Sequence, residues 1–395
     1  MVNIDKIKKS LQEENVDGWL FYNFKNLDPS ANNILEIPKE KIFTRRWFYF
    51  IPRDGNPIKL AHRIEDKSLD HLPGDKLVYS SWKELHQNLK NILSPFKHIC
   101  MQYSPLNAIP YVSFVDAGTV ELIQQTGVNI KSSANLIQRF EAVVDSQSLD
   151  SHKKAAVILK EIVFQAFELV KNTILAEKQI TEYEVQQFII AKFEANNMEC
   201  DHPPIVAVNE HSGDPHYEPS PQNSSYIKRK DILLIDLWAK FKQENSIYAD
   251  ITWMCVVDDV VAFEYAKIFN IARDARENAS KYIQERLDNN QEVYGYQIDD
   301  ICRKTIEDAG YGKYFVHRTG HSIGKDVHWK GVNMDNFETK DERKLIDGIL
   351  FSIEPGIYMS NFGVRTEIDM YIENGKAHIS CPPAQSELIP ILRPV

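Results

Sequence analysis

The sequence lacks the basic charge and the apolar runs that a nucleic-acid or membrane partner would require. Of its 395 residues, 46 are lysine or arginine and 56 are aspartate or glutamate, which gives a formal net charge of -10. No basic stripe offsets this acidic balance, so binding to nucleic acid or to an anionic membrane is excluded. No stretch has the apolar length of a membrane span or of a signal peptide. We therefore expect a cytoplasmic protein.

Cysteine is scarce, and its spacing carries no motif. The five cysteines are odd in number, scattered and without C-x-x-C spacing: Cys100, Cys200, Cys255, Cys302 and Cys381. This pattern excludes a disulfide framework and indicates a reducing compartment. Repeats of fixed period, low-complexity segments and a glycine-proline linker are also absent from the sequence.

The length and the 43% of apolar residues are enough for two hydrophobic cores. Strands and helices alternate in the first part, which predicts an α/β layer domain over 1–148. The polar stretch 145–151 marks the join to a second domain over 149–395. In the first domain the patterns predict helices over 4–15, 82–93 and 111–125, and strands over 18–22, 47–52 and from 58 onward. Its histidines are scattered singly and are expected to be surface or structural residues: His62, His71, His86 and His98.

The second domain also mixes helices and strands, so the predicted fold class is α/β (α+β). Apolar residues at helical spacing predict a long helix over 152–174. Thr181-Glu-Tyr-Glu184 is a capping box that opens a second helix to about residue 195. Further helices are expected over 261–287 and 296–309. Strands are expected over 231–241 and 247–257, joined by the polar turn 242–246.

The chemistry of the chain is concentrated in the stretch Phe315–Trp329. It contains His317, His321 and His328, and Gly320 and Gly324 let backbone pass close to the middle histidine. Such a cluster suits a metal site or a proton-transfer site.

Four carboxylates each interrupt an apolar run: Asp236, Asp250, Glu354 and Glu367. A buried carboxylate costs several kcal/mol unless a cation or strong donors meet it. Four that converge without a cation would repel one another and take up protons. Two divalent cations would cancel their four charges, and two metals roughly 3.5 to 4 Å apart can support amide cleavage.

Alternation along the strands is consistent with such convergence. Asp250 and Thr252 share one face of their strand, and Arg365, Glu367 and Asp369 share one side of the last strand. Taken singly, a buried aspartate is more often a helix cap or a salt-bridge partner, and the last strand reads as a surface ladder of charges.

In chain order, Asp236, Asp250, His321, Glu354 and Glu367 match the five ligands of the M24 metallopeptidases. The segments G-H-S-I-G, S-I-E-P-G and V-R-T-E at 320–324, 352–356 and 364–367 are motifs of the proline-directed branch of that family, the Xaa-Pro aminopeptidases (aminopeptidase P) and Xaa-Pro dipeptidases (prolidases). The chain resembles this branch specifically from about Asp201 onward and loosely before Ser151. The resemblance implies a C-terminal pita-bread domain, creatinase/aminopeptidase-like, preceded by a smaller creatinase/prolidase-like α/β domain.

The resemblance also implies a mechanism with two divalent metal ions, manganese best and cobalt, iron or zinc as alternatives. Asp236 would bind one ion, His321 and Glu354 the other, and Asp250 and Glu367 would bridge them. A hydroxide shared by the ions would attack the peptide carbonyl, with Glu354 as proton shuttle. The resemblance assigns roles to four further residues. His328 would stabilise the oxyanion or relay a proton, and Arg365 would hold a carboxylate. His216 would lie against the scissile bond, and His317 against the residue after it. His216 gains its role from the resemblance, because alone it reads as a surface histidine in a loop.

Two departures from the family pattern stand out. The Asp236 to Asp250 gap is fourteen residues, longer than usual in the family, which we attribute to a longer turn that leaves strand pairing intact. Trp253 stands where many relatives have arginine, and it is expected to alter the pocket wall or a subunit contact.

The expected substrates are peptides with proline second. An Xaa-Pro bond has no N–H to bind and a ring to enclose, so its site needs an apolar wall, for which Phe315, Tyr358 and Trp329 are candidates. The motifs leave aminopeptidase and dipeptidase open. The alternatives are a catalytically inactive M24-fold binding or scaffold protein and a metal-free hydrolase of the creatinase kind. Fold analogy adds the expectation of a homodimer.

Overall fold

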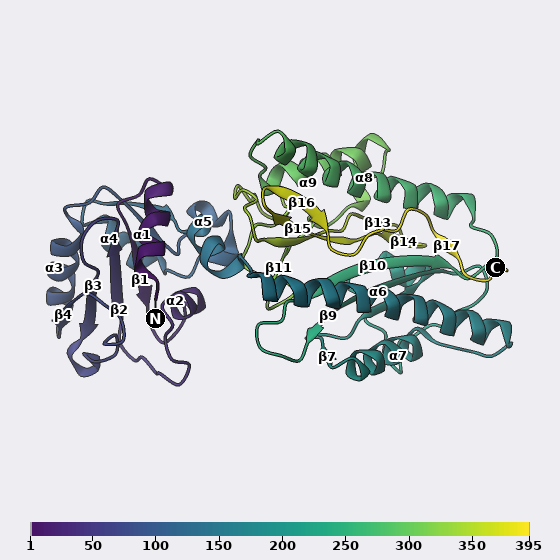
Figure 1. Cartoon of the computed structure of the whole chain (residues 1–395), viewed down its shortest axis with the longest axis horizontal. Coiled ribbons are helices and arrows are strands. Elements are labelled where there is room, and N and C mark those ends of the chain that lie inside the picture. The colour runs from purple at the N-terminus through teal and green to yellow at the C-terminus, as the bar shows by residue number, and fades with distance from the viewer. Residues whose placement is uncertain (1, 395) are drawn as a thin grey trace. The chain divides into compact units, whose positions relative to one another are not determined.

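The computed structural model describes residues 2–394, and the chain divides into two units, Met1–Glu141 and Ala142–Val395. Figure 1 shows the chain coloured along its length, with the first unit in purple to blue and the second in blue-teal to yellow. Within the described residues, no helix is both long enough and apolar enough to cross a membrane.

The first unit is built on one 6-stranded sheet in the order β4-β3-β2-β1-β5-β6. β1 pairs antiparallel with β2, which pairs antiparallel with β3, whereas β3–β4, β1–β5 and β5–β6 are parallel. The strands are β1 (Gly18–Asn23), β2 (Trp47–Pro52), β3 (Ile58–His62), β4 (Asp75–Tyr79), β5 (His98–Met101) and β6 (Asn129–Ser132).

Helices cover both faces of this sheet because side chains alternate along its central strands. On β1, Trp19 and Phe21 belong to the core that contains the apolar residues of α1, whereas Leu20 and Tyr22 belong to the core beneath α3 and α4. The helices are α1 (Ile4–Glu13), α2 (Pro29–Ile34), α3 (Trp82–Leu93), α4 (Ala117–Gln124) and α5 (Ala134–Ile137). The predicted helix over 111–125 is too long at its start. The observed helix α4 begins only after Asp116, whose carboxylate accepts the Thr119 N–H and caps α4.

Residues 142–394 of the second unit form three sheets. A 5-stranded sheet has the order β17-β10-β9-β7 with β8 also paired to β9, a 4-stranded sheet has the order β11-β12-β15-β16, and β13 pairs with β14. The strands are β7 (Met198–Glu199), β8 (Ile205–Val208), β9 (Ile232–Phe241), β10 (Ala249–Val256), β11 (Ser322–Ile323), β12 (Leu350–Ile353), β13 (Gly356–Tyr358), β14 (Gly363–Arg365), β15 (Ile368–Glu373), β16 (Lys376–Ile379) and β17 (Ile389–Pro390).

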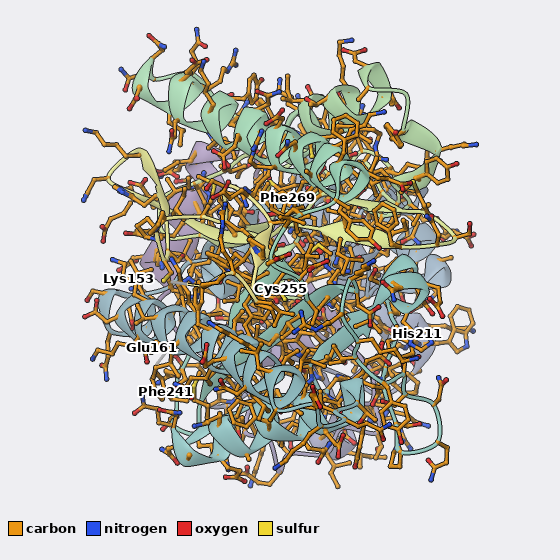
Figure 2. The ribbon with its side chains drawn as sticks, turned by 90° about the vertical axis from the view of Figure 1, so that its right-hand side faces the viewer. Lys153, Glu161, His211, Phe241, Cys255 and Phe269 are labelled. Carbon is orange, nitrogen blue, oxygen red and sulfur yellow. The ribbon has the colours of Figure 1, made fainter. Side chains whose placement is uncertain are left out.

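Two pairs of helices enclose these sheets (Figure 1). They are α6 (Ser146–Leu175) with α7 (Glu182–Ala195), and α8 (Phe263–Asp288) with α9 (Gly295–Asp308). The predicted capping box is confirmed, since Thr181 and Glu184 cap α7 reciprocally. Figure 2 shows the second unit end on, with Phe269 and Cys255 toward its middle and Lys153 and Glu161 of α6 toward its edge. Phe269 belongs to the core on the α8 side and Cys255 to the core on the α6 side.

The β9–β10 hairpin separates these two cores. Leu233, Ile235 and Leu237 of β9 pack toward α6, whereas Ile232 and Leu234 pack toward α8. Asp236 follows on the α8-side face.

The pairing of this hairpin brings its two aspartates together. Thr252 is paired with Asp236, and Asp250 with Trp238, so both aspartates lie on the face that continues the α8-side core. Ala239 still pairs with Ala249. The connection over 242–248 therefore leaves the strand pairing intact, as predicted.

Trp253 does not lie on the face of the aspartates. Its side chain is in the α6-side core, where its ring centroid is 5.2 Å from that of Phe164 and Lys160 Nζ lies 5.1 Å from the ring centroid. The expectation that it alters the pocket wall is wrong, because alternation points residue 253 away from residues 250 and 252.

The carboxylates of the last strands lie at breaks rather than inside continuous strands. Glu354 lies between β12 and β13, where Pro355 has no N–H to donate, and Glu367 lies between β14 and β15. Arg365, Glu367 and Asp369 are 4%, 3% and 2% exposed, so the surface-ladder interpretation is wrong.

Gly320 provides a test of the close packing between the backbone of the histidine stretch and β12. A Cβ at this position would collide with the Ser352 carbonyl oxygen on β12, which cannot withdraw like a flexible side chain. We expect Gly320→Ala to lower the free energy of unfolding by about 1–3 kcal/mol, as overpacking does. Gly118→Ala, in the first turn of α4 where space is available, is the control and should be neutral or stabilising. Equal effects of the two substitutions on denaturant unfolding would contradict the packing described.

Candidate metal centre

A cavity of about 350 Å³ in the second unit collects nearly all the residues that the sequence singled out. It is lined by all five predicted ligands and by His216, His328 and Arg365, together with Asp201, His202, Pro203, Ile205, Pro215, Tyr217, Glu218, Trp238 and Val327. Of the predicted site residues, His317 alone is missing from this lining.

His321 is oriented to use one ring nitrogen as a ligand. Its Nδ1 lies 3.2 Å from the Ser322 carbonyl oxygen, to which it can only donate. Nε2 then carries the lone pair, and it lies 3.5 Å from Asp250 Oδ2 and 3.4 Å from Glu354 Oε1. Ligand atoms of Asp250, His321 and Glu367 all lie within 4.8 Å of one another. One ion can therefore contact all three.

The carboxylates keep oxygen atoms without a hydrogen-bond partner in the interior. Asp236 Oδ1, Asp250 Oδ1 and Glu367 Oε1 are buried and accept no hydrogen bond from the described residues. Burial, reinforced by the neighbouring carboxylates, raises the pKa of Asp250 and of Glu367 well above the usual range, and burial raises that of Glu354 to about 7. Orphaned acidic oxygens around a neutral imidazole fit divalent cations, which would supply the missing charge.

Arg365 neutralises one side of this cluster. It forms an ion pair with Asp236 through Nη2, and its Nε donates to Thr252 Oγ1 at 3.1 Å. Thr252 Oγ1 in turn donates to Glu367 Oε2 at 2.7 Å. The fork of Arg365 therefore orients two of the predicted ligands, one directly and one through a hydroxyl group.

The other histidines occupy different places around the cavity. The ring of His328 stands edge-on to His321 with centroids 4.3 Å apart, and burial lowers the pKa of His328 to about 4, so it is neutral near pH 7. His216 lies at the exposed rim, where its backbone N–H donates to Asp214.

His317 lies behind the cavity wall. Its Nδ1 is 2.7 Å from the Arg318 carbonyl oxygen, and its Nε2 is 2.8 Å from Tyr358 OH, which also accepts a hydrogen bond from Arg365. The structure therefore brings His317 to Arg365 through Tyr358, and not to the cavity where a substrate would lie.

The prediction of which residues form the apolar wall is wrong. Phe315, Tyr358 and Trp329 do not line the cavity, and Phe315 is buried in the α8-side core. The apolar lining comes instead from Pro203, Ile205, Pro215 and Val327, joined by the rings of Tyr217 and Trp238. These residues come from loops and a strand face whose convergence no local pattern predicts.

Asp369 and His152 complete the support for the site, and neither was assigned a role from the sequence. Asp369 Oδ2 accepts the Asp250 N–H at 2.8 Å and lies 3.9 Å from His152 Nε2. His152 is fully buried, with Nδ1 2.6 Å from the Tyr248 carbonyl oxygen and Nε2 2.7 Å from Ser380 Oγ. Strand alternation could have indicated Asp369, whereas His152 was hidden in a helical stripe of apolar residues.

Comparison with solved structures supports the fold. Dipeptidase PepE from Mycobacterium ulcerans aligns with a TM-score of 0.65 at 20% identity, covering 98% of this chain and 96% of that one. X-prolyl aminopeptidase from Caenorhabditis elegans, described as a cytosolic enzyme with a di-nuclear active site, aligns with a TM-score of 0.63 at 15% identity, covering 97% of this chain and 62% of that one. The fold is therefore the pita-bread fold of these peptidases preceded by an α/β unit.

Sequence comparison also finds Xaa-Pro peptidases among the proteins similar to this chain. The chain is 24% identical over 378 residues to an Xaa-Pro dipeptidase of Lactobacillus delbrueckii subsp. lactis, with 93% of each chain covered. It is 28% identical over 293 residues to an Xaa-Pro dipeptidase of Pyrococcus furiosus, covering 69% of this chain and 79% of that one. The family model of metallopeptidase family M24 matches residues 150–374, which include all five predicted ligands. With this match over more than half of its length, the chain belongs to metallopeptidase family M24.

Proposed function

We propose that this protein is an exopeptidase that hydrolyses the Xaa-Pro bond at the amino end of peptides with two divalent metal ions. The observation that carries the proposal is the single cavity lined by Asp236, Asp250, His321, Glu354 and Glu367, with acidic oxygens left unpartnered in its wall. The names of relatives with Xaa-Pro activity support the substrate class. A binding or scaffold protein would have no need for this costly concentration of buried charge.

The five side chains would hold the two ions between them. Asp236 would hold one ion, His321 and Glu354 the other, and Asp250 and Glu367 would contact both. A donor set of carboxylates with one imidazole suits manganese, with cobalt, iron(II) or zinc as alternatives. When bound, the ions would lower the pKa of a water molecule and polarise the peptide carbonyl.

The protein's own residues would then position the substrate and move protons. Glu354 lines the cavity with Oε1 3.4 Å from His321 Nε2, where it would also act as the proton shuttle of the reaction. His328 lines the cavity beside His321, where it would donate to the oxygen that becomes negative in the transition state. His216, at the rim, would lie against the scissile bond.

Arg365, in the cavity wall, and His317, behind it, would act through the ligands. Arg365 holds Asp236 and Thr252, and its contact with Tyr358 links it to His317. Both residues would therefore orient ligands, and neither needs to touch the substrate.

The apolar part of the cavity lining favours a substrate whose scissile bond has no amide N–H. Pro203, Pro215 and Val327 offer apolar surface to a proline ring. The N-terminal α/β domain over 1–148 and the catalytic domain over 149–395, a cytoplasmic location and a homodimer complete the proposal.

The direct test is turnover of matched peptides after metal removal with a chelator and restoration of manganese. An Xaa-Pro dipeptide, an Xaa-Pro-Yaa peptide and a Met-Ala-led control are compared. Cleavage of the longer proline peptide identifies an aminopeptidase, and cleavage of the dipeptide alone identifies a dipeptidase. If two metals bind and no proline peptide is cleaved, the chain is a binding protein.

We expect Glu354→Gln to fold normally and to lose turnover by about 100-fold or more, because one ligand charge and a proton-transfer group vanish together. Glu264→Gln, on the exposed first turn of α8, is the matched control and should keep full activity. The measurement is kcat for the best proline peptide at saturating manganese, with circular dichroism to verify the fold. Near wild-type kcat for Glu354→Gln would refute its role.

Metal-induced stabilisation should grow with pH. Burial raises the folded-state pKa of Asp250, Glu367 and Glu354, so their protonated forms stabilise the metal-free fold at low pH, and this stability is lost as pH rises from about 4.5 through 7 and beyond. Metal ions replace these protons. We therefore expect manganese to raise Tm more at about pH 7.5 than at about pH 5.5.

Glu367→Gln separates this effect from metal binding elsewhere. Glutamine is neutral without taking up a proton, so the variant should raise the Tm of the metal-free protein near pH 7.5, while the gain on adding manganese should shrink. A metal-free Tm that falls, or a full manganese gain in this variant, would contradict the assignment of Glu367 to the cluster.

A further inference from the structure

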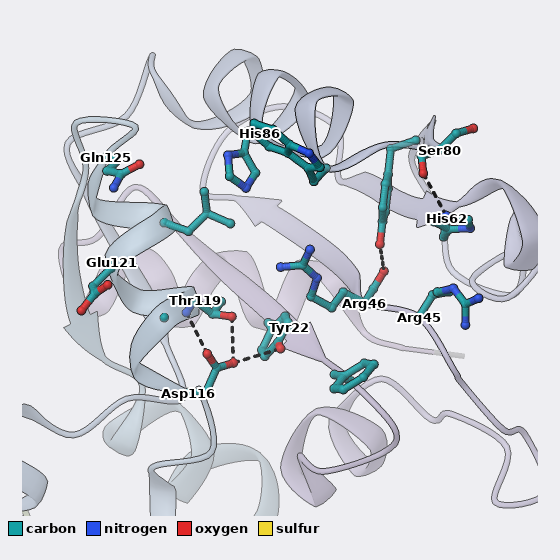
Figure 3. Close-up of a pocket in the computed structure, with 15 residues that line it drawn as sticks. Tyr22, Arg45, Arg46, His62, Ser80, His86, Asp116, Thr119, Glu121 and Gln125 are labelled. Atoms are coloured by element: carbon teal, nitrogen blue, oxygen red, sulfur yellow. Dashed lines mark hydrogen bonds between the residues drawn. The ribbon is translucent and has the colours of Figure 1, made fainter.

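The first unit has a cavity of about 780 Å³ that the proposed peptidase function does not use. All of its lining residues belong to this unit: Tyr22, Phe24, Arg45, Arg46, His62, Tyr79, Ser80, Trp82, His86, Asp116, Gly118, Thr119, Glu121, Leu122 and Gln125 (Figure 3). It thus unites His62 and His86, which the sequence left as scattered residues.

The cavity lies where ligands bind in other α/β sheets. Tyr22, His62 and Tyr79 are at the carboxyl ends of β1, β3 and β4, and α3 and α4 begin beside them. The chain runs outward from β1 to β4 on one side of the sheet and then crosses to β5 and β6 on the other side of β1. The crevice beyond the carboxyl ends of strands at such a reversal is a general ligand position in open α/β sheets.

Arg46 offers this cavity an unused set of donors. Its guanidinium points into the cavity, and it has no ion-pair or hydrogen-bond partner among residues 2–394 (Figure 3). The side chain is half-buried, and Tyr79 OH donates to the Arg46 carbonyl oxygen at 2.7 Å and fixes the backbone beneath it. A partly desolvated guanidinium with free donors in a fork geometry matches a carboxylate.

Asp116 presents the opposite charge to the same cavity. Its Oδ2 accepts hydrogen bonds from Tyr22 OH at 3.0 Å and Thr119 Oγ1 at 2.8 Å, whereas Oδ1 accepts only the Thr119 N–H at 2.9 Å. These bonds lower the pKa of Asp116 against the effect of burial, which keeps it ionised. Oδ1 retains a lone pair, and the carboxylate does not pair with Arg46.

Aromatic side chains supply the apolar part of the wall. Trp82 is 61% exposed although it is large and apolar, and its ring stands at 5.3 Å from that of His86. Phe24 and Tyr79 complete this lining. An exposed indole beside a guanidinium with free donors and a carboxylate with a free lone pair is typical of a binding surface.

We propose that this cavity binds a zwitterion, a free amino acid or a short peptide with an apolar side chain. Its carboxylate pairs with Arg46, its ammonium group with Asp116, and its side chain packs against Trp82. The site lies outside the metal centre and goes beyond the proposed function, so it stands or falls independently of peptidase activity.

The test is isothermal titration calorimetry of the full-length, metal-loaded protein with L-phenylalanine and glycyl-L-phenylalanine, which distinguish the amino acid from the peptide. N-acetyl-L-phenylalanine lacks the ammonium group and L-phenylalaninamide lacks the carboxylate. At least one zwitterion should bind. Both blocked compounds should bind at least about 10-fold more weakly than L-phenylalanine, since each loses a charge-assisted hydrogen bond.

Variants test whether the measured heat of binding comes from this cavity rather than from the metal centre. Arg46→Gln should weaken binding of the zwitterion about 10-fold or more. Arg53→Gln, on the surface of the same unit outside the cavity, is the matched control and should bind as wild type. Asp116→Asn should weaken binding as well, and because Asp116 caps α4, its thermal unfolding is measured alongside.

Three results would overturn the proposal. They are no binding of either zwitterion, N-acetyl-L-phenylalanine binding as tightly as L-phenylalanine, and unchanged affinity in Arg46→Gln. The second result would identify a simple anion site. Loss of self-association in Arg46→Gln without any ligand binding would instead make the cavity a contact between two copies of the chain.

Discussion

The structure of the second unit depends on one electrostatic constraint: acidic side chains are buried together where water cannot stabilise their charge. Asp236, Asp250 and Glu367 are 7%, 5% and 3% exposed, and Asp369 lies beside them at 2%. Arg365 balances one negative charge through its ion pair with Asp236, but it cannot balance the rest. Without cations the cluster must hold protons, which the raised pKa values of Asp250 and Glu367 express. Membership of a metallopeptidase family and the need to neutralise this buried negative charge therefore both indicate bound metal ions.

The fold positions this cluster with ordinary strand geometry. One face of the β9–β10 hairpin is apolar along its whole length and packs on α6 and α7. The other face begins with Ile232 and Leu234 against α8 and then changes to Asp236 and Asp250. Packing of the apolar halves thus fixes the polar ends, and the supporting hydrogen bonds of Thr252 and Asp369 to the neighbouring carboxylate and backbone hold the ligands in place.

The strand faces could be predicted from the sequence because they follow from local periodicity, whereas the grouping of the five ligands rested on the resemblance to the M24 metallopeptidases. Alternation put Asp250 and Thr252 on one face and Glu367 and Asp369 on one side, and the capping box located the start of α7. Contacts between distant segments could not be predicted in the same way. His152 looked like part of an apolar helix stripe, and Phe315 and Trp329 were assigned to a wall that other residues form. Trp253 was expected at the pocket wall or at a subunit contact, and it points away from the cavity. In the first unit, single histidines gave no signal of the cavity that the sheet ends create around Arg46.

We propose that two cations neutralise the buried carboxylates as one cluster. Anomalous diffraction from crystals grown with manganese tests it directly. We expect two anomalous peaks per chain, roughly 3.5 to 4 Å apart, both in contact with Asp250 and Glu367, with His321 and Glu354 on one and Asp236 on the other. A cavity without a peak, or a single ion that leaves Asp236 bound to Arg365 alone, would contradict it.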